Sequence, residues 1–176
     1  MLAFLRYLPL AASLGLLTAC FVSEDALIGQ GVRLHDGPVA FCLGPDDPCL
    51  PAPLEGDTYL AASGDSGTPM RFVPLTEAGG QPVWLGEAEI REEDSDERAF
   101  MILVARPESF AADGTLNIRI MTPDCYEAGE DMRARYGIEQ VDQYICATPD
   151  LETLSAYLIE RHGADFADPD WWEGSN

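Results

Sequence analysis

The chain has 176 residues and a mass of 19.1 kDa, enough for one domain of ordinary size. Hydrophobic residues make up 47% and charged residues 23%, which permits a packed core and excludes a wholly disordered chain. The 31 Asp and Glu far outnumber the 10 Lys and Arg, all of which are Arg. The formal net charge of −21 excludes both a basic nucleic-acid interface and a polybasic membrane patch.

The N-terminal segment, residues 1–20, has the pattern of an export signal. Arg6 supplies a positive charge, and the run from Leu8 to Ala19 is apolar and ends in small residues. Its length fits the ~7–15 apolar residues of a secretory signal and falls short of the about 20 that a transmembrane helix needs. We therefore predict that residues 1–19 are a signal peptide, removed during export.

The end of this segment, Leu17-Thr18-Ala19-Cys20, resembles the lipobox of bacterial lipoprotein precursors. The resemblance covers the signal segment alone, and no family resemblance extends to the remaining chain. It implies that a diacylglyceryl group is attached to the Cys20 sulfur and that the chain is cut before Cys20. The alternative is an ordinary secretory signal with a cysteine there by chance.

The residue after the lipobox cysteine bears on sorting. In the lipoproteins best known for sorting, Asp in that place favours retention in the inner membrane, so Phe21 implies the periplasmic face of the outer membrane. The strongly acidic chain repels anionic lipids, so attachment must come from the acyl chains on Cys20. We expect two partners, the membrane through these acyl chains and an envelope protein, and no nucleic acid.

The five cysteines are an odd number for an exported protein. Assigning Cys20 to lipid leaves four, which predicts two disulfides with three possible connectivities. We favour Cys42–Cys49 and Cys125–Cys146, because each pair joins near neighbours in the sequence. A zinc site is the alternative, but the cysteines lack the short spacing of zinc modules and the chain has two His.

Residues 20–30 are predicted to be the lipidated cysteine and a short tether, and residues 31–163 a single α+β domain. Short apolar or alternating runs, separated by Gly, Pro and Asp, predict its strands. These runs are Val32–Leu34, Val39–Phe41, Thr58–Ala62, Met70–Leu75, Val83–Ile90, Ala99–Ala105 and Leu116–Met121. We expect about six strands in an antiparallel, sandwich-like sheet, followed by two C-terminal helices and stapled by the disulfides.

Two similar tripeptides predict the starts of the two helices. Thr122-Pro123-Asp124 and Thr148-Pro149-Asp150 each offer a capping Thr, a Pro for the first helical position and an acid for the positive helix end. Gly137 and Gly163 would end the two helices.

Residues 164–176 form an acidic and aromatic tail. Its Trp171 and Trp172 allow two interpretations. The tail folds back and packs its indoles on the domain, or it is an exposed ligand for a protein partner.

One segment resembles a catalytic motif. Ser63-Gly64-Asp65-Ser66-Gly67 is similar to the sequence around the nucleophile of trypsin-like proteases and to the first block of the GDSL hydrolases. That resemblance implies Ser66 as nucleophile, with His35 or His162 within hydrogen-bond reach. The other blocks of both families are missing here, and a turn between two strands explains the segment equally well.

The acidic run 92–97 is either a solvated hairpin loop or a weak Ca²⁺ ligand set.

The chain shows no phosphate-binding loop and no cofactor fingerprint, and we assign it no catalytic residue, cofactor or metal. The leading hypothesis is a lipid-anchored, non-enzymatic interaction or structural module that faces the periplasm. The alternative is a lipoprotein that binds a small molecule or a cation, which predicts a formed pocket with a few convergent polar groups. A serine hydrolase that uses Ser66 is the third hypothesis.

Overall fold

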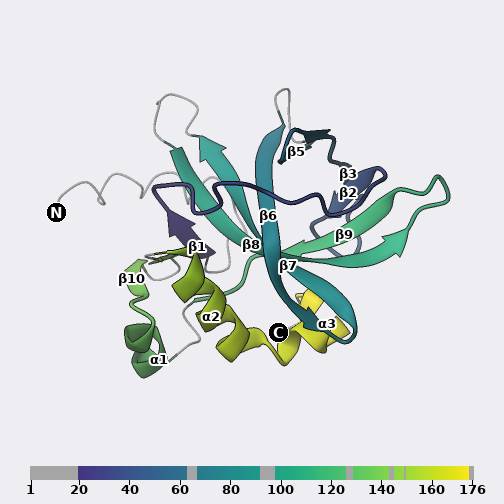
Figure 1. Cartoon of the computed structure of the whole chain (residues 1–176). Helices are drawn as coiled ribbons and strands as arrows, with labels where there is room; N and C mark the ends of the chain where they lie inside the picture. The colour runs from purple at the N-terminus through teal and green to yellow at the C-terminus, as the bar shows by residue number, and fades with distance from the viewer. Residues whose placement is uncertain are drawn as a thin grey trace.

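The structure is a computed structural model, and it describes residues 20–62, 67–91, 98–125, 129–142, 145–148 and 150–174. Figure 1 shows a strongly curled sheet with the long strands β6, β7 and β8 across its middle. Helices α2 and α3 lie along one side of the sheet, and the β8–β9 hairpin projects at the end opposite β1.

The sheet has 11 strands in the described part of the chain. They are β1 (Cys20–Ser23), β2 (Val39–Cys42), β3 (Leu50–Pro51), β4 (Leu54–Glu55), β5 (Thr58–Ala61), β6 (Thr68–Ala78), β7 (Gln81–Arg91), β8 (Arg98–Phe110), β9 (Leu116–Met121), β10 (Glu139–Asp142) and β11 (Ile145–Ala147). The order is β10-β11-β1-β8-β7-β6-β5-β4, and β9 pairs with both β8 and β2.

Strand β8 determines the shape of the sheet. Along one edge it pairs antiparallel with β7 over eight residue pairs, from Arg98 to Ala105. Along its other edge it pairs first with β1, through Phe100 and Met101, and then with β9, from Val104 onward. The sheet therefore branches along β8 and curls into a half-barrel.

Gly86 in the middle of β7 permits the tight curl. A Cβ atom there would come within 2.6 Å of the Phe72 ring on β6, closer than two carbon atoms can approach. The β6–β7 hairpin turns at Gly79 and Gly80, whose φ angles of 59° and 76° favour glycine.

Two apolar cores cover the two faces of the sheet. The core inside the curl contains Leu34, Val39, Phe41, Ala52, Tyr59, Ala61, Met70, Phe72, Trp84, Ala88, Leu103, Ala105, Leu116, Ile118 and Ile120. The core between the sheet and the helices contains Phe21, Val83, Leu85, Ile102, Val104, Cys125, Ile138, Cys146, Leu154, Tyr157, Leu158, Phe166 and Trp172. The central strands are buried on both faces, which explains why β7 and β8 are apolar without strict alternation.

The described helices are short. They are α1 (Glu130–Arg135), α2 (Leu151–His162), the 3₁₀ helix η3 (Asp165–Ala167) and α3 (Pro169–Trp172). Helix α2 begins after Asp150, whose side chain accepts a hydrogen bond of 2.7 Å from the Thr153 amide. Thr148, the predicted cap, lies two residues earlier and is buried.

The predicted α+β class with about six strands and two helices is wrong: the described chain is mostly β. Strands β3, β4, β10 and β11 have two to four residues, too short to give a recognisable period. The predicted strand Val32–Leu34 is not a strand, and the helix expected after Thr122 starts only at Glu130. The sheet is also mixed, since β1 runs parallel to β11 and β2 parallel to β9.

Both expected disulfides are present. Cys42–Cys49 closes a short loop after β2, with the two Cα atoms 4.2 Å apart. Cys125–Cys146 joins the segment after β9 to β11, with the Cα atoms 6.1 Å apart. The second bond ties β11, the parallel neighbour of β1, into the helix-side core.

The two end segments differ from the sequence prediction. Residues 20–30 are not a tether: β1 is a strand of the sheet, and Phe21 and Ile28 are buried. The described part of the tail packs on the domain, with Phe166 and Trp172 in the helix-side core.

Candidate functional site

The candidate site is a cleft of about 350 Å³ beside β2, β3 and β5. Its lining residues are Arg33, His35, Gly37, Pro38, Val39, Pro51, Ala52, Pro53, Leu54 and Tyr59. Prolines, aliphatic side chains and one tyrosine form the walls, and Arg33 and His35 are the only basic side chains among the lining residues.

The segment before β2 is fixed to the sheet by two hydrogen bonds. The Val32 amide donates to the Phe72 carbonyl at 2.8 Å, and the Leu34 amide donates to the Tyr59 hydroxyl at 2.8 Å. Val32 and Leu34 pack on the core inside the curl. Their neighbours in the sequence, Arg33 and His35, line the cleft instead.

Arg33 differs from the other described arginines. Each of those has an ion pair, a ring contact or another polar partner; they are Arg71, Arg91, Arg98, Arg106, Arg119, Arg133, Arg135 and Arg161. Within the described ranges Arg33 alone lacks such a contact, and it is exposed. The cleft is therefore lined by a positive charge that pairs with no acidic side chain of the described ranges, in a chain whose net charge is −21.

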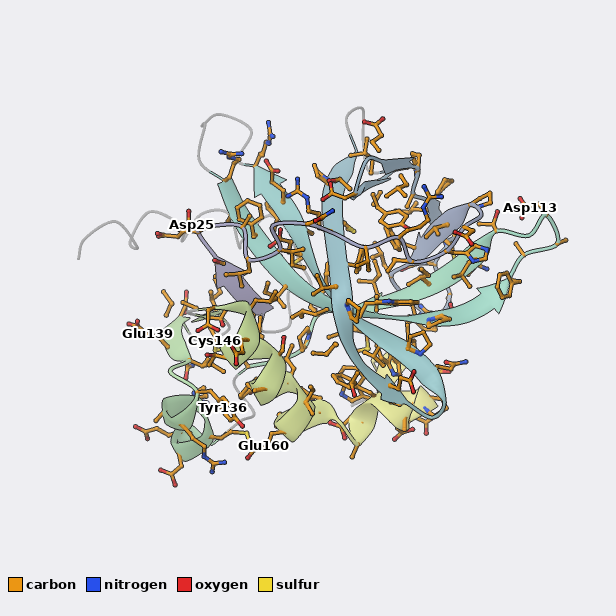
Figure 2. All side chains as sticks on the ribbon, viewed as in Figure 1. Asp25, Asp113, Tyr136, Glu139, Cys146 and Glu160 are labelled. Carbon is orange, nitrogen blue, oxygen red and sulfur yellow. A yellow bond between two sulfur atoms is a disulfide. The ribbon has the colours of Figure 1, made fainter. Side chains whose placement is uncertain are left out.

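His35 is held between two features of the fold. Its ring meets the edge of Phe110 at a centroid distance of 5.5 Å and an interplanar angle of 66°. A Cβ atom at Gly37 would lie 3.0 Å from its Nε2 atom, so that glycine gives the imidazole its space. Phe110, 65% exposed, is the last residue of β8 and lies next to the turn of the projecting hairpin. Asp113 lies at the tip of that hairpin (Figure 2).

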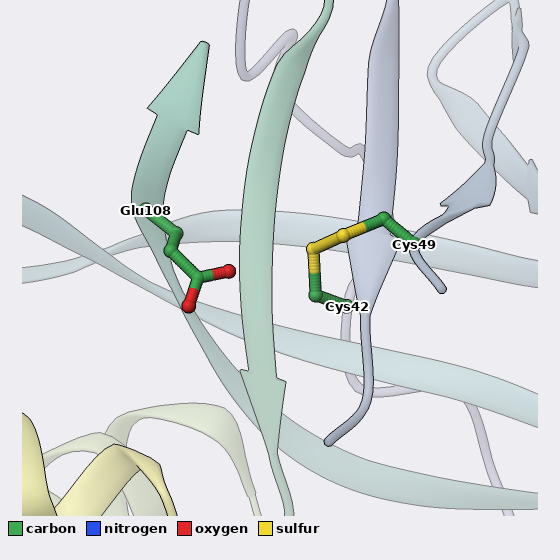
Figure 3. Close-up of side chains that lie close together, drawn as sticks. All are labelled: Cys42, Cys49 and Glu108. Atoms are coloured by element: carbon green, nitrogen blue, oxygen red, sulfur yellow. A yellow bond between two sulfur atoms is a disulfide. The ribbon is translucent and has the colours of Figure 1, made fainter. Parts of the chain in front are cut away.

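A second cluster resembles a metal site and is not one. The sulfur atoms of Cys42 and Cys49 and a carboxylate oxygen of Glu108 lie within 4.8 Å of one another (Figure 3). The two cysteines form a disulfide, so neither offers the thiolate that binds metal ions. Glu108 instead pairs with the buried Arg119, whose Nε donates to it at 3.1 Å.

Glu87 on β7 is a buried carboxylate with a structural role. Its Oε2 accepts hydrogen bonds from the amides of Leu27 at 2.8 Å and Ile28 at 3.0 Å. Arg71 Nη1 lies 4.0 Å from Oε1. Loss of solvation raises the pKa of Glu87 above its usual range, more than these hydrogen bonds lower it.

The residues singled out by sequence do not converge on one site. Cys20 begins β1 at the end opposite the projecting hairpin (Figure 1). Ser66 and the acidic run 92–97 lie outside the described residues, so the structure does not describe a hydrolase or Ca²⁺ geometry there. His162 is buried on the helix side, with Nδ1 3.1 Å from an Asp165 carboxylate oxygen.

The two tail indoles belong to the core rather than to an exposed ligand. Trp172 is 2% exposed, and its Nε1 donates to the Phe166 carbonyl at 3.1 Å. Trp171 is half-buried against the rings of His162 and Phe166. The interpretation of Trp172 as an exposed partner contact is therefore wrong.

Sequence reasoning missed the cleft, because it treated Val32–Leu34 as a strand. One signal was available: Pro38, Pro51 and Pro53 lie in or beside short apolar runs, and each removes a backbone donor that a long regular strand would need.

Comparison with protein-family models, with curated proteins and with solved structures finds no match. Among the described helices, none has both the length and the apolar character needed to span a membrane.

Proposed function

We propose that the chain is a lipid-anchored protein of the bacterial envelope whose domain is a non-enzymatic interaction module facing the periplasm. The observation that carries this proposal is the pair of disulfides, Cys42–Cys49 and Cys125–Cys146, in a chain whose residues 17–20 have the lipobox pattern. Cleavage before Cys20 would leave every described strand and helix intact.

The two disulfides support the export part of this proposal. Disulfides persist in oxidising compartments such as the periplasm and are rare in the cytosol. Phe21 in place of Asp supports the outer membrane, on the sorting pattern of known lipoproteins.

The test is the mass of the N-terminal peptide of the mature protein. The chain has no Lys, so trypsin should release residues 20–33 as one peptide bearing the lipid. Cells fed an alkyne-tagged fatty acid should label the wild-type chain and the control Ser23→Ala, but not Cys20→Ser. Label retained in Cys20→Ser, or a wild-type peptide that still contains residues before Cys20, would contradict lipidation.

A second candidate function, small-molecule binding, is favoured by the cleft. Its volume of about 350 Å³ falls in the range of ligand sites, and Arg33 and His35 converge there among apolar walls. Binding would change the environment of His35, and that change is the measurement that tests it. A cation is not the ligand this cleft favours, because Arg33 repels it.

A further inference from the structure

The charge of the cleft opposes the charge of the protein around it. The whole chain has 31 acidic residues, yet none is among the described residues that line the cleft. Arg33 lines the cleft and has no ion pair within the described ranges. An arginine without a carboxylate in so acidic a chain marks a place where an anion from outside is favoured.

The walls and volume restrict what that anion can be. Pro38, Pro51 and Tyr59 offer apolar surface rather than hydrogen-bond donors. A guanidinium pairs with carboxylates and with phosphates. Among the described lining residues Arg33 alone carries a permanent positive charge, which balances the single charge of a carboxylate but not the charge of nearly two on a phosphate monoester. The cleft has a volume of about 350 Å³, and a water-sized group occupies about 30 Å³. The cleft can therefore hold a ligand of about a dozen non-hydrogen atoms.

We propose that the cleft binds a small amphipathic carboxylate. The guanidinium of Arg33 donates to the carboxylate, a ring N–H of His35 supplies a further donor, and the apolar body lies against Pro38, Pro51 and Tyr59. This proposal rests on the binding role of the cleft and not on acylation of Cys20.

The chain carries its own reporter for this site. It has two histidines: His35 lines the cleft, and His162 is buried between α2 and the tail. Selective isotope labelling of histidine therefore gives two imidazole signals in an NMR spectrum, one from the cleft and one internal control.

The experiment uses the full chain as the cell produces it, in lipid nanodiscs, with empty nanodiscs as blank. Cyclohexanecarboxylate is titrated against its neutral isostere, cyclohexanecarboxamide, and against the cation aminomethylcyclohexane. The carboxylate should shift the His35 signal saturably and leave His162 unchanged. It should bind at least about threefold more tightly than the carboxamide, the range of an exposed ion pair.

Arg33→Gln should abolish the preference for the carboxylate over the carboxamide. Because Arg33 is exposed, this change leaves the packing of both cores intact. Arg98→Gln removes an equal charge from the start of β8, outside the cleft, and should leave the preference as in the wild type.

The outcomes separate the ligand class from the binding role. If the wild type binds the carboxylate and the carboxamide with equal affinity, and Arg33→Gln binds them as the wild type does, the ligand is not specifically a carboxylate, although the cleft remains a binding site. A His35 signal that none of the three probes shifts, or His162 shifting equally, overturns both. Inorganic phosphate that displaces the carboxylate with equal affinity overturns the role given to the apolar body. None of these results bears on the lipid anchor.

Discussion

The carboxylate of Glu87 fastens the N-terminal segment to the sheet. It lies in the middle of β7 and accepts from the two successive amides of Leu27 and Ile28. Those amides would otherwise lack a partner in a part-buried place, and a buried donor without a partner costs about 1–3 kcal/mol. Sequence alone marks Glu87 only as a charge inside an apolar strand, since its partners lie about 60 residues away.

Replacing Glu87 tests that role. Glu87→Ala should lower the free energy of unfolding by about 2–4 kcal/mol, because both amides lose their acceptor. Glu87→Gln keeps an acceptor of the same shape and should cost clearly less. Urea unfolding followed by tryptophan fluorescence measures both variants. If Glu87→Gln lowered the free energy of unfolding as much as Glu87→Ala, the N-terminal segment would depend on the negative charge of Glu87 rather than on its hydrogen-bond acceptor.

The raised pKa of Glu87 also predicts a pH dependence. Burial holds the pKa of Glu87 in the folded chain above the value of 4.5 that it has when exposed, so the folded state binds its proton more tightly. Its contribution to stability is therefore full below about pH 4.5 and is lost as the pH rises through the folded pKa. The unfolding free energy of the wild type, measured relative to Glu87→Gln, should fall as the pH rises above about 4.5. A difference that stays constant over this range would contradict the raised pKa.

At the scale of elements, the long strands were predictable and the short ones were not. Leu116–Met121 alternates cleanly and is β9 as expected, and the apolar run Ala99–Ala105 lies within β8. Strands β10 and β11 exist because Cys125–Cys146 and the β1 edge hold them, and neither contact shows in a local pattern. The cleft was hidden for the same reason: its segments meet only after the sheet has curled.

The tail is an element of the core, and its two indoles should contribute unequally. Trp172 is buried against Phe166, and the guanidinium carbon of Arg106 lies 4.8 Å from its ring centre. Trp172→Ala should therefore lower the free energy of unfolding by about 3–5 kcal/mol.

Trp171→Ala is the matched control for that change. Because Trp171 is half-buried, Trp171→Ala should lower the free energy of unfolding clearly less than Trp172→Ala does. Thermal unfolding of both variants measures the difference. Equal losses would mean that the tail does not pack through Trp172 in particular.

At the scale of the whole molecule, the proposed anchor and the candidate cleft lie toward different ends. Strand β1, which begins at Cys20, is at one end of the sheet, and the β8–β9 hairpin projects at the other (Figure 1). Phe110 of that hairpin contacts His35 of the cleft. If Cys20 carries the lipid, the cleft and the hairpin would therefore lie at the end of the domain that is farther from the anchor.

If Cys20 carries the proposed lipid, its place in β1 also limits how far from the membrane the protein can reach. A lipoprotein with a long disordered linker can search a wide volume above its membrane, but here β1 pairs with β11 from Cys20 and with β8 from Val22. A domain of this size has a radius of gyration of about 15 Å. Once anchored, it could touch only what comes within its own diameter of the lipid surface, so its partners would be other residents of that membrane or molecules that diffuse to it.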